Sequence, residues 1–367
     1  MILIVGGGYA GAATAWALAR RGLGRDVVLL DAEPRPGAHA SGRNAGLLAA
    51  LLEEDPAMAA MSARGAQLLH ESFGTTRCGS ILLVPDARAA QTLLDRAAEL
   101  GVKAEASQTS TLAREIPVLA GTPSPLGVRC PADAKLEPAA LLESYLDAAR
   151  RAGARVVAGA RVTAVVTRGG RAAGVETTSG RFDADRVVNA AGAWAGPLGT
   201  MAGLTDLGLV PYRRHLFISA PMAAVGPSWP FVWDLERQTY FRPDAPRLML
   251  CMCDEEPHPP SPPEVVAQAR TRMEESIRVS FPALTNVTIE DQRACLRTFA
   301  PDRRYVIGPD PRMPGFFWVA GLGGSGVVAG AAIGEMAADL LLDRDAGGPG
   351  PGRARDFDPS RLIGFGG

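Results

Sequence analysis

The chain has 367 residues, of which 47% are hydrophobic and 21% charged, and its formal net charge is −1. This length can bury one large core or two modest ones. The near-neutral charge balance gives no reason to expect a nucleic acid or an anionic membrane as a partner. Apolar runs fall short of a transmembrane segment, and the first expected strand begins at residue 2, which leaves no room for a signal peptide. We therefore expect a soluble, cytoplasmic protein.

The residues that usually carry metal or disulfide chemistry are few and scattered. No C-x-x-C pair occurs, and the histidines show no ligand spacing, so we expect neither a disulfide framework nor a metal site. Cys251 and Cys253 would share one face of a strand, most simply as small buried residues. All but two of the 38 basic residues are arginine, so a mechanism that needs a lysine has only Lys103 and Lys135 as candidates.

The first 31 residues have the pattern of a dinucleotide-binding unit. An apolar strand (2–5) leads into Gly6, Gly8 and Gly11, a helical pattern (12–20) follows, and a second apolar run (27–30) ends at Asp31. The glycines allow a tight turn and close approach to a pyrophosphate at the positive end of the helix. Asp31 would accept hydrogen bonds from the ribose hydroxyls. The alternatives at this point are a nicotinamide or a flavin dinucleotide, or a tight turn without a ligand.

Helix and strand signals alternate along the rest of the chain. We expect helices at 49–72, 87–100, 136–153 and 265–279, a strand at 80–86, short strands from 155 to 188, and a strand-rich region from 209 to 252. Residues 315–342 predict a buried strand, a glycine-rich turn and a long apolar helix. The segment "GGPGPGR" (347–353) is expected to be a loose linker.

Three further segments are suited to lie against a dinucleotide. In "ASGRNAG" (40–46), Ser41, Arg43 and Asn44 offer polar groups for a pyrophosphate or a ring edge, although a polar surface loop would read the same way. "NAAGAW" (189–194) and "GLGGSGV" (321–327) supply small residues that permit close packing. The backbone N–H groups of residues 321–327, and the positive N-terminal end of the helix expected after them, would stabilise the negative charge that develops on a reduced ring system. Their alternatives are an ordinary strand-to-helix turn and a helix cap.

Together with "LRTFAPDRRYVIGPDP" (296–311), these segments resemble motifs of the D-amino-acid-oxidase-like flavoenzymes, which include glycine oxidase, sarcosine oxidase and bacterial D-amino-acid dehydrogenases, D-arginine dehydrogenase above all. The resemblance implies FAD as the cofactor. It also implies an α/β architecture, with a Rossmann-like FAD-binding domain and an interleaved α+β substrate domain built on a mixed, largely antiparallel sheet. We assign residues 1–76, 136–208 and 296–367 to the FAD-binding domain, and 77–135 and 209–295 to the substrate domain.

The resemblance also assigns roles to individual residues. Arg297 matches the family's arginine that binds the substrate carboxylate. Tyr240 in "TYFRPD" matches a tyrosine that donates a hydrogen bond to the same carboxylate, and Arg214 in "YRRHLF" matches a further arginine of the pocket. A guanidinium can bind a carboxylate through two parallel hydrogen bonds. The residues expected at the cofactor are Gly6, Gly8, Gly11, Asp31, Ser41, Arg43, Asn44, Ala45, Gly46, Ala191, Gly192, Trp194, Gly323, Gly324, Ser325 and Gly326.

The sequence departs from the family pattern at the substrate pocket. The acid that pairs with a substrate guanidinium in D-arginine dehydrogenase falls near Ser80, and pocket His and Tyr residues fall near Leu47 and Leu52. A basic substrate would bury an unpaired cation there, so small or apolar amino acids fit better. Leu47 and Leu52 also suit an ordinary core.

Two departures concern the flavin. The stretch 247–253 lacks the lysine that assists oxygen in sarcosine oxidases, so a quinone-type carrier is an alternative acceptor to oxygen. Cys295 lies seven residues before Asp302, the spacing of a covalent flavin cysteine in monomeric sarcosine oxidase. We expect non-covalent FAD, with attachment at Cys295 as the alternative.

The sequence thus predicts an FAD-dependent oxidation of a small or apolar amino acid, either a D-amino acid or an N-alkyl glycine, at its Cα–N bond. Hydride would pass to flavin N5, and the imine product would hydrolyse to a keto acid. Two alternatives remain open: a dehydrogenase of 2-hydroxy acids, and a non-catalytic flavoprotein that helps to assemble a partner. A nicotinamide dehydrogenase fits less well, because "GLGGSG" and "SGRNAG" would have no role in it.

Overall fold

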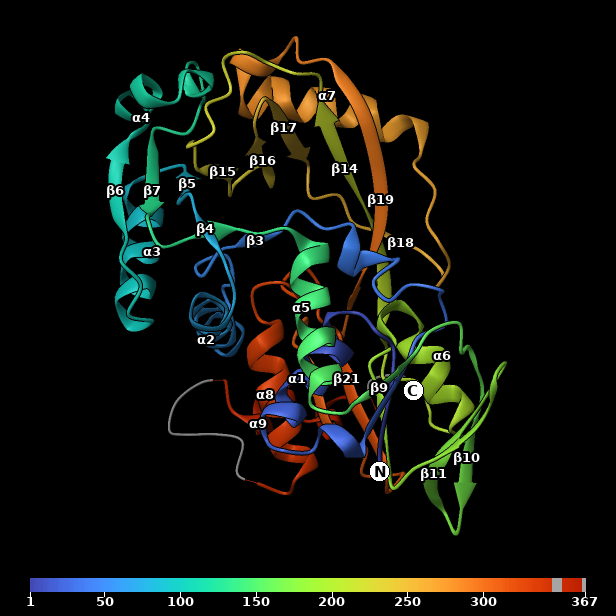
Figure 1. Cartoon of the computed structure of the whole chain (residues 1–367). Helices are drawn as coiled ribbons and strands as arrows, with labels where there is room; N and C mark the ends of the chain where they lie inside the picture. Colours follow the sequence, from blue (N-terminus) through green and yellow to red (C-terminus); the bar gives the residue numbers. More distant parts are fainter. Residues whose placement is uncertain (345–351, 365–367) are drawn as a thin grey trace.

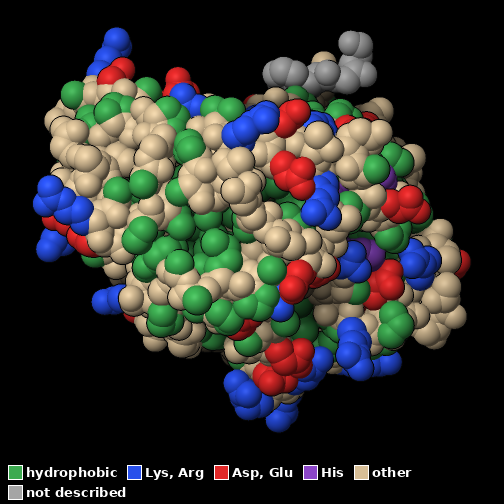
Figure 2. Space-filling view, turned by 90° about the horizontal axis from the view of Figure 1, so that it is seen from above, with side chains coloured by type: hydrophobic (Ala, Val, Ile, Leu, Met, Phe, Trp, Pro, Cys, Tyr) green, Lys and Arg blue, Asp and Glu red, His purple; other side chains and the backbone are tan. Residues whose placement is uncertain are grey.

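A computed structural model describes residues 1–344 and 352–364, so most of the linker expected at 347–353 lies outside the described residues. Two large sheets make up the molecule, one above the other in Figure 1. On the face shown in Figure 2, hydrophobic side chains gather mainly in the left half, and acidic and basic side chains lie beside one another in small groups at the rim and across the right half. Among the described residues, no helix combines the length and the apolarity that crossing a membrane requires.

The lower sheet has six strands in the order β20-β21-β13-β1-β2-β9. All its pairs are parallel except β20 with β21. Its central strands are short runs of Val, Ile and Leu that are buried on both faces, which is typical of a parallel sheet covered on each side. The strands are β1 (Ile2–Val5), β2 (Val27–Leu30), β9 (Arg155–Val157), β13 (Arg186–Asn189), β20 (Val306–Pro309) and β21 (Phe316–Ala320).

Helices cover one face of this sheet and a small antiparallel sheet covers the other. The helices are α1 (Tyr9–Arg20), α5 (Pro138–Arg151) and α8 (Gly330–Leu341), with α2 (Pro56–Ser72) packed against α8. The opposite layer consists of β10 (Val162–Arg168), β11 (Arg171–Thr177), β12 (Gly180–Asp183) and α6 (Ala195–Met201). A Cβ on Gly334 would lie 2.4 Å from the carbonyl oxygen of Ala13, so this glycine lets α1 and α8 pack backbone to backbone.

The upper sheet has nine strands and is largely antiparallel; only β5 and β15 pair in parallel. Its longest pair joins β14 to β19, and β19 reaches down toward the lower sheet (Figure 1). The strands are β5 (Ser80–Val84), β6 (Glu105–Gln108), β7 (Leu126–Cys130), β14 (Val210–Ser219), β15 (Phe231–Asp234), β16 (Thr239–Asp244), β17 (Arg247–Cys251), β18 (Glu256–Pro257) and β19 (Ile289–Phe299). The flanking helices are α3 (Ala87–Glu99), α4 (Thr109–Glu115) and α7 (Ala267–Ser280).

This arrangement confirms the expected fold class. The assignment of segments to two domains stays a proposal, and β19 runs across the boundary expected at residue 296. The elements not yet named are a small sheet of β3 (Leu47–Leu48), β4 (Thr76–Arg77) and β8 (Ala134–Lys135), and the short helix α9 (Ala354–Phe357).

One helix boundary differs clearly from the prediction. The helix expected over 49–72 begins only at Pro56, because Asp55 caps it by accepting hydrogen bonds from the N–H groups of Ala57 and Met58. Residues 49–55, which were expected to form its first turns, have no regular secondary structure and follow directly on β3. α8 likewise begins at Gly330 and not directly after Gly326. The positive helix end expected beside the glycine loop is therefore separated from it by residues 327–329.

Candidate active site

Each glycine of the first turn is required for a different structural reason. Gly6 has φ +109°, and a Cβ there would lie 2.3 Å from the carbonyl oxygen of Ala190. A Cβ on Gly11 would lie 2.0 Å from the carbonyl oxygen of Gly6. Gly8 precedes α1 and lines the cavity described below, whereas Gly11 does not. The turn thus exposes the N-terminus of α1 to the cavity, where a pyrophosphate is stabilised by the helix dipole.

Asp31 follows β2 at the edge of the same cavity. Its carboxylate accepts hydrogen bonds from the N–H groups of Gly7 (2.7 Å) and Glu33 (2.8 Å). Burial raises the pKa of Asp31, and these two hydrogen bonds partly offset the effect. The carboxylate is therefore held in one orientation, with lone pairs left for ribose hydroxyls.

The loop Ala40–Gly46 divides its residues between internal support and the cavity. Ser41 Oγ accepts a hydrogen bond from the N–H of Tyr9 (3.0 Å), and Asn44 Nδ2 donates to the carbonyl of Ser41 (2.7 Å). Both side chains still line the cavity, but these polar atoms stabilise the loop. Arg43 lines the cavity and has no ion pair within the described residues, so its guanidinium is available to an anion.

Ala45 and Gly46 were expected at the cofactor, but they lie outside the cavity lining. Both are buried, and Arg242 Nη1 donates to the carbonyl of Ala45 (2.6 Å). Gly46 has φ +62°, and a Cβ there would lie 2.1 Å from the carbonyl oxygen of Leu136. Ala45 packs in a buried cluster with residues of the upper sheet, and Gly46 fits against the backbone that follows β8.

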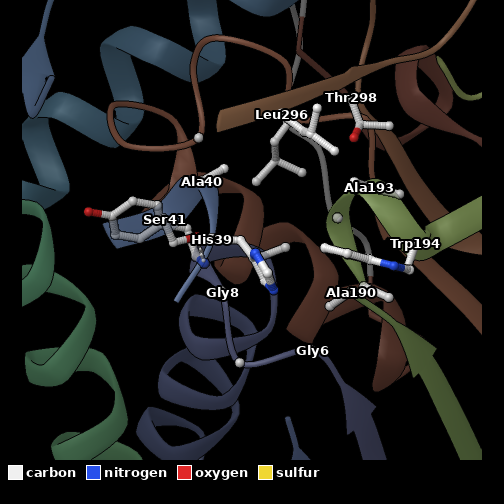
Figure 3. Close-up of a pocket in the computed structure, with 18 of the residues that line it drawn as sticks. Gly6, Gly8, His39, Ala40, Ser41, Ala190, Ala193, Trp194, Leu296 and Thr298 are labelled. Atoms are coloured by element: carbon white, nitrogen blue, oxygen red, sulfur yellow. Dashed lines mark hydrogen bonds between the residues drawn. The ribbon is translucent and has the colours of Figure 1, made fainter. Parts of the chain in front are cut away.

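The cavity, of about 350 Å³, extends from the first turn to β19 (Figure 3). Gly6 and Gly8 lie on one side of it, Ala190, Ala193 and Trp194 on another, and Leu296 and Thr298 close it from above. Ala191 and Gly192 also line it, as expected.

Sequence reasoning missed His39 and Thr298, which also line the cavity. The imidazole of His39 lies 4.6 Å from the Trp194 ring, centroid to centroid, and contacts Glu33 Oε1 through Nε2 (3.2 Å). Thr298 follows Arg297 on β19. Their signals in the sequence were only their positions beside recognised motifs.

The glycine-rich loop after β21 presents backbone to the cavity. Gly323, Gly324 and Gly326 line it, but Ser325 does not and is 7% exposed. Gly323 has φ +52°, and a Cβ there would lie 2.3 Å from the ring of Phe299. A Cβ on Gly324 would lie 3.2 Å from Arg297 Nη1, so the absence of a side chain lets the guanidinium rest against the loop.

Arg297 is the cation at the upper end of the cavity. It has no ion pair to a carboxylate in the part of the chain that the structure describes. Burial alone would lower the pKa of Arg297, but the ionisable groups of Tyr240, Cys295 and Cys251 raise it, so the guanidinium stays charged. A charged, partly buried guanidinium without a carboxylate partner is a site for an anionic ligand.

Tyr240 lies close enough to Arg297 for each to affect the other's ionisation. It is 1% exposed, its ring is 4.4 Å from that of Trp233, and burial raises its pKa far above the ordinary value. It remains a neutral phenol and a hydrogen-bond donor. It is not part of the cavity wall, so contact with a ligand held by Arg297 remains a prediction.

Arg214 is engaged by the protein itself. Its Nη2 lies 2.7 Å from Glu255 Oε1, and its Nε donates to the carbonyl of Asp254 (3.0 Å). Glu255 also binds Arg303 at 2.9 Å. Arg214 lies outside the cavity lining, so the structure favours a role in supporting β14 over direct contact with a carboxylate.

A buried acid lies beside Ser80, where the sequence comparison predicted a substrate pocket without negative charge. Ser80 Oγ donates to Asp133 Oδ2 (2.6 Å), and burial raises the pKa of Asp133 to about 6. Asp133 is 3% exposed and has no ion pair among the described residues. Leu47 and Trp233 pack against the buried cluster that contains Tyr240, and Leu52 packs against the cluster that contains Leu82. Tyr240 therefore has apolar neighbours as well as the charged Arg297.

Cys295 lines the cavity on β19, where burial raises its pKa and favours the thiol. Neither Lys103 nor Lys135 lines the cavity.

The fold and cavity define a dinucleotide-binding protein in which β19 of the second sheet places the charged Arg297 in the wall of the cavity. Comparison with known proteins agrees: the model of the FAD dependent oxidoreductase (DAO) family matches residues 1–340. The chain belongs to this family and is an FAD-dependent oxidoreductase. The residues fit the cofactor, because Gly6 and Gly8 of the first turn, Asp31, and the loop glycines Gly323, Gly324 and Gly326 all line one continuous cavity.

Relatives vary in the share of their length that this chain spans. It is 28% identical over 369 residues to the uncharacterised oxidoreductase YurR of Bacillus subtilis, covering 93% of this chain and 95% of YurR. It is 26% identical over 254 residues to human mitochondrial dimethylglycine dehydrogenase, covering 64% of this chain but only 29% of that protein. The fold is similar to L-proline dehydrogenase of P. horikoshii, with a TM-score of 0.86, 22% identity, and coverage of 98% and 97%.

Proposed function

We propose that this chain oxidises the Cα–N bond of a small or apolar amino acid, either a D-amino acid or an N-alkyl glycine. The observation that carries the proposal is Arg297: a charged guanidinium with no carboxylate partner in the described chain, resting against the glycine-rich loop. Bound FAD supplies the hydride acceptor. Arg297 would hold the substrate carboxylate through two hydrogen bonds and so fix which Cα–H bond faces the cofactor.

Tyr240 would donate a further hydrogen bond to the same carboxylate, because its raised pKa keeps the phenol protonated. The apolar neighbours of Tyr240, including Leu47 and Trp233, favour a substrate with a short or apolar side chain. The names of two similar proteins point the same way, since dimethylglycine and proline are both amino acids with an alkylated nitrogen. The imine product would hydrolyse in water to an oxo acid.

The electron acceptor is proposed to be oxygen or a quinone-type carrier. Both lysines lie away from the cavity, so no ammonium group is available there to assist oxygen. We therefore favour the carrier. Oxygen consumption compared with the reduction of a quinone analogue, each with the same amine substrate, separates the two: rapid oxygen uptake without the quinone would contradict this preference.

The experiment is an anaerobic panel. The purified yellow protein is mixed separately with D- and L-alanine, sarcosine, dimethylglycine, proline and lactate, and the visible absorbance of oxidised flavin is followed. We expect bleaching by one of the amines. Bleaching by lactate alone would instead favour oxidation of a 2-hydroxy acid, because Arg297 would hold either carboxylate. Flavin that no small carboxylate reduces would favour the non-catalytic alternative.

A further inference from the structure

Ser325 is the member of the glycine-rich loop whose side chain turns away from the cavity. Its neighbours Gly324 and Gly326 line the cavity, but Ser325 is 7% exposed and does not. Its hydroxyl donates a close hydrogen bond to Glu53 Oε1. Glu53 lies in the extended segment before α2, so this contact joins two parts of the chain 272 residues apart.

Two further contacts connect the segment before α2, and α2 itself, to residues near the glycine-rich loop. A Cβ on Gly65 in α2 would lie 2.0 Å from the carbonyl oxygen of Val328, so α2 presses directly on the end of the loop. Asp55, the cap of α2, binds Arg304 Nη2 at 2.6 Å, just before β20. The segment from residue 53 and α2 therefore contact the loop at Ser325 and Val328, and neither Glu53 nor Gly65 lines the cavity.

The contact between Glu53 and Ser325 lies in a buried polar cluster. Burial raises the pKa of Glu53, while the hydrogen bond from Ser325 and the charges of Arg303 and Arg96 oppose this effect. Tyr305 belongs to the same cluster: burial raises its pKa, Glu53 raises it further, and hydrogen bonding with Ser325 and Ser62 opposes this effect. Polar groups buried in this way are costly, and packing alone would be served better by apolar side chains.

We propose that Glu53 is a positioning residue for the FAD-binding loop. By accepting the hydrogen bond of Ser325, it turns that side chain away from the cavity and so fixes the backbone of Gly323, Gly324 and Gly326 in the conformation that faces the cofactor. Glu53 lies outside the cavity lining, so its effect on FAD passes through Ser325. The proposal deepens the functional one but rests on FAD binding alone, and it holds whatever substrate is oxidised.

The test measures the FAD dissociation constant of the apo-protein by flavin fluorescence, and hydrogen exchange of residues 321–327 without FAD. Glu53→Ala and Ser325→Ala should each weaken FAD binding by about tenfold, because a hydrogen bond to a carboxylate is lost. Both should speed exchange in the loop. Glu53→Gln retains an acceptor oxygen and should bind FAD within about threefold of the parent protein. Glu54→Ala, a change at the exposed neighbour, should leave both readouts unchanged.

A double-mutant cycle shows whether the two residues act as a pair. The Glu53→Ala/Ser325→Ala protein should bind FAD no more weakly than either single variant. Additive losses, Glu53→Gln as weak as Glu53→Ala, or parental affinity in Glu53→Ala would each overturn the proposal. If Glu53→Ala fails to fold, Ser325→Ala alone must show the weaker affinity and faster exchange. These readouts need no substrate, so they stand apart from a failure of the proposed reaction.

Discussion

Replacing Arg297 by alanine should remove most of the catalytic efficiency while leaving the flavin bound. Arg297 has no carboxylate partner in the described protein, so its hydrogen-bonding capacity is free for the substrate. Two hydrogen bonds to a charged group contribute about 1.5 kcal/mol each at the low end, or about 3 kcal/mol together. That corresponds to a loss of about 100-fold or more in kcat/KM. Arg297→Lys should recover part of the loss, because an ammonium cannot form the two-pronged contact.

The assay is the rate of anaerobic flavin reduction as a function of substrate concentration, from stopped-flow absorbance. A matched control is Arg270→Ala on α7, where the arginine is half exposed and pairs with Glu274 one helical turn away. The control should change neither rate nor affinity. The reasoning would be refuted if Arg297→Ala retained flavin and reduced it with substrate as fast, and at the same concentrations, as the parent protein.

Three other changes follow from the packing and ionisation of single residues. Gly11→Ala should abolish FAD binding or folding, because the new Cβ would lie 2.0 Å from the carbonyl of Gly6; a yellow, stable variant would contradict the geometry of the turn. Burial raises the pKa of Asp133 from 3.8 to about 6, so its ionisation makes unfolding easier as pH rises through this range. Asp133→Asn should therefore raise the free energy of unfolding at pH 8 by about 1 kcal/mol or more and flatten its decline between pH 4 and 6; a variant less stable than the parent at pH 8 would argue against an ionised, unpaired acid. The raised pKa of Cys295 keeps it a thiol, and acid precipitation should release the FAD into the supernatant, whereas flavin retained in the pellet would indicate attachment.

The parts of the fold that could be predicted from sequence are those with local signals. The strand before Gly6 and the one before Asp31 are short apolar runs, and the helices α3, α5 and α7 begin within two residues of their expected starts. The boundary of α2 was missed because the apolar residues before Asp55 read as a continuation of the helix. In the structure Leu51 instead belongs to a buried cluster with residues of β5 and β7, contacts that depend on residues far along the chain.

The site shows the same division. Arg297, two glycines of the turn (Gly6 and Gly8) and the loop glycines Gly323, Gly324 and Gly326 line one cavity, because each belongs to a motif with a fixed place in the fold. Arg214 forms an ion pair with Glu255, and no local sequence pattern predicts that pair. Asp133 likewise reaches Ser80 only through the pairing of β5 with β7. Partners of buried charges come from tertiary contacts, and sequence patterns do not encode those locally.

The central claim, that this chain oxidises a carbon–nitrogen bond with its FAD, is tested most directly by an anaerobic single turnover with product analysis. Protein carrying oxidised FAD is mixed with the amine that bleaches it, and the oxo acid and the released amine are quantified against the flavin reduced. We predict one equivalent of each product per flavin. For proline the expected product is instead one amino oxo acid per flavin, because its imine is cyclic and its nitrogen stays attached when the ring opens. Flavin that dithionite reduces but no amino acid on the panel bleaches would contradict the account, and so would bleaching without these nitrogen-containing products.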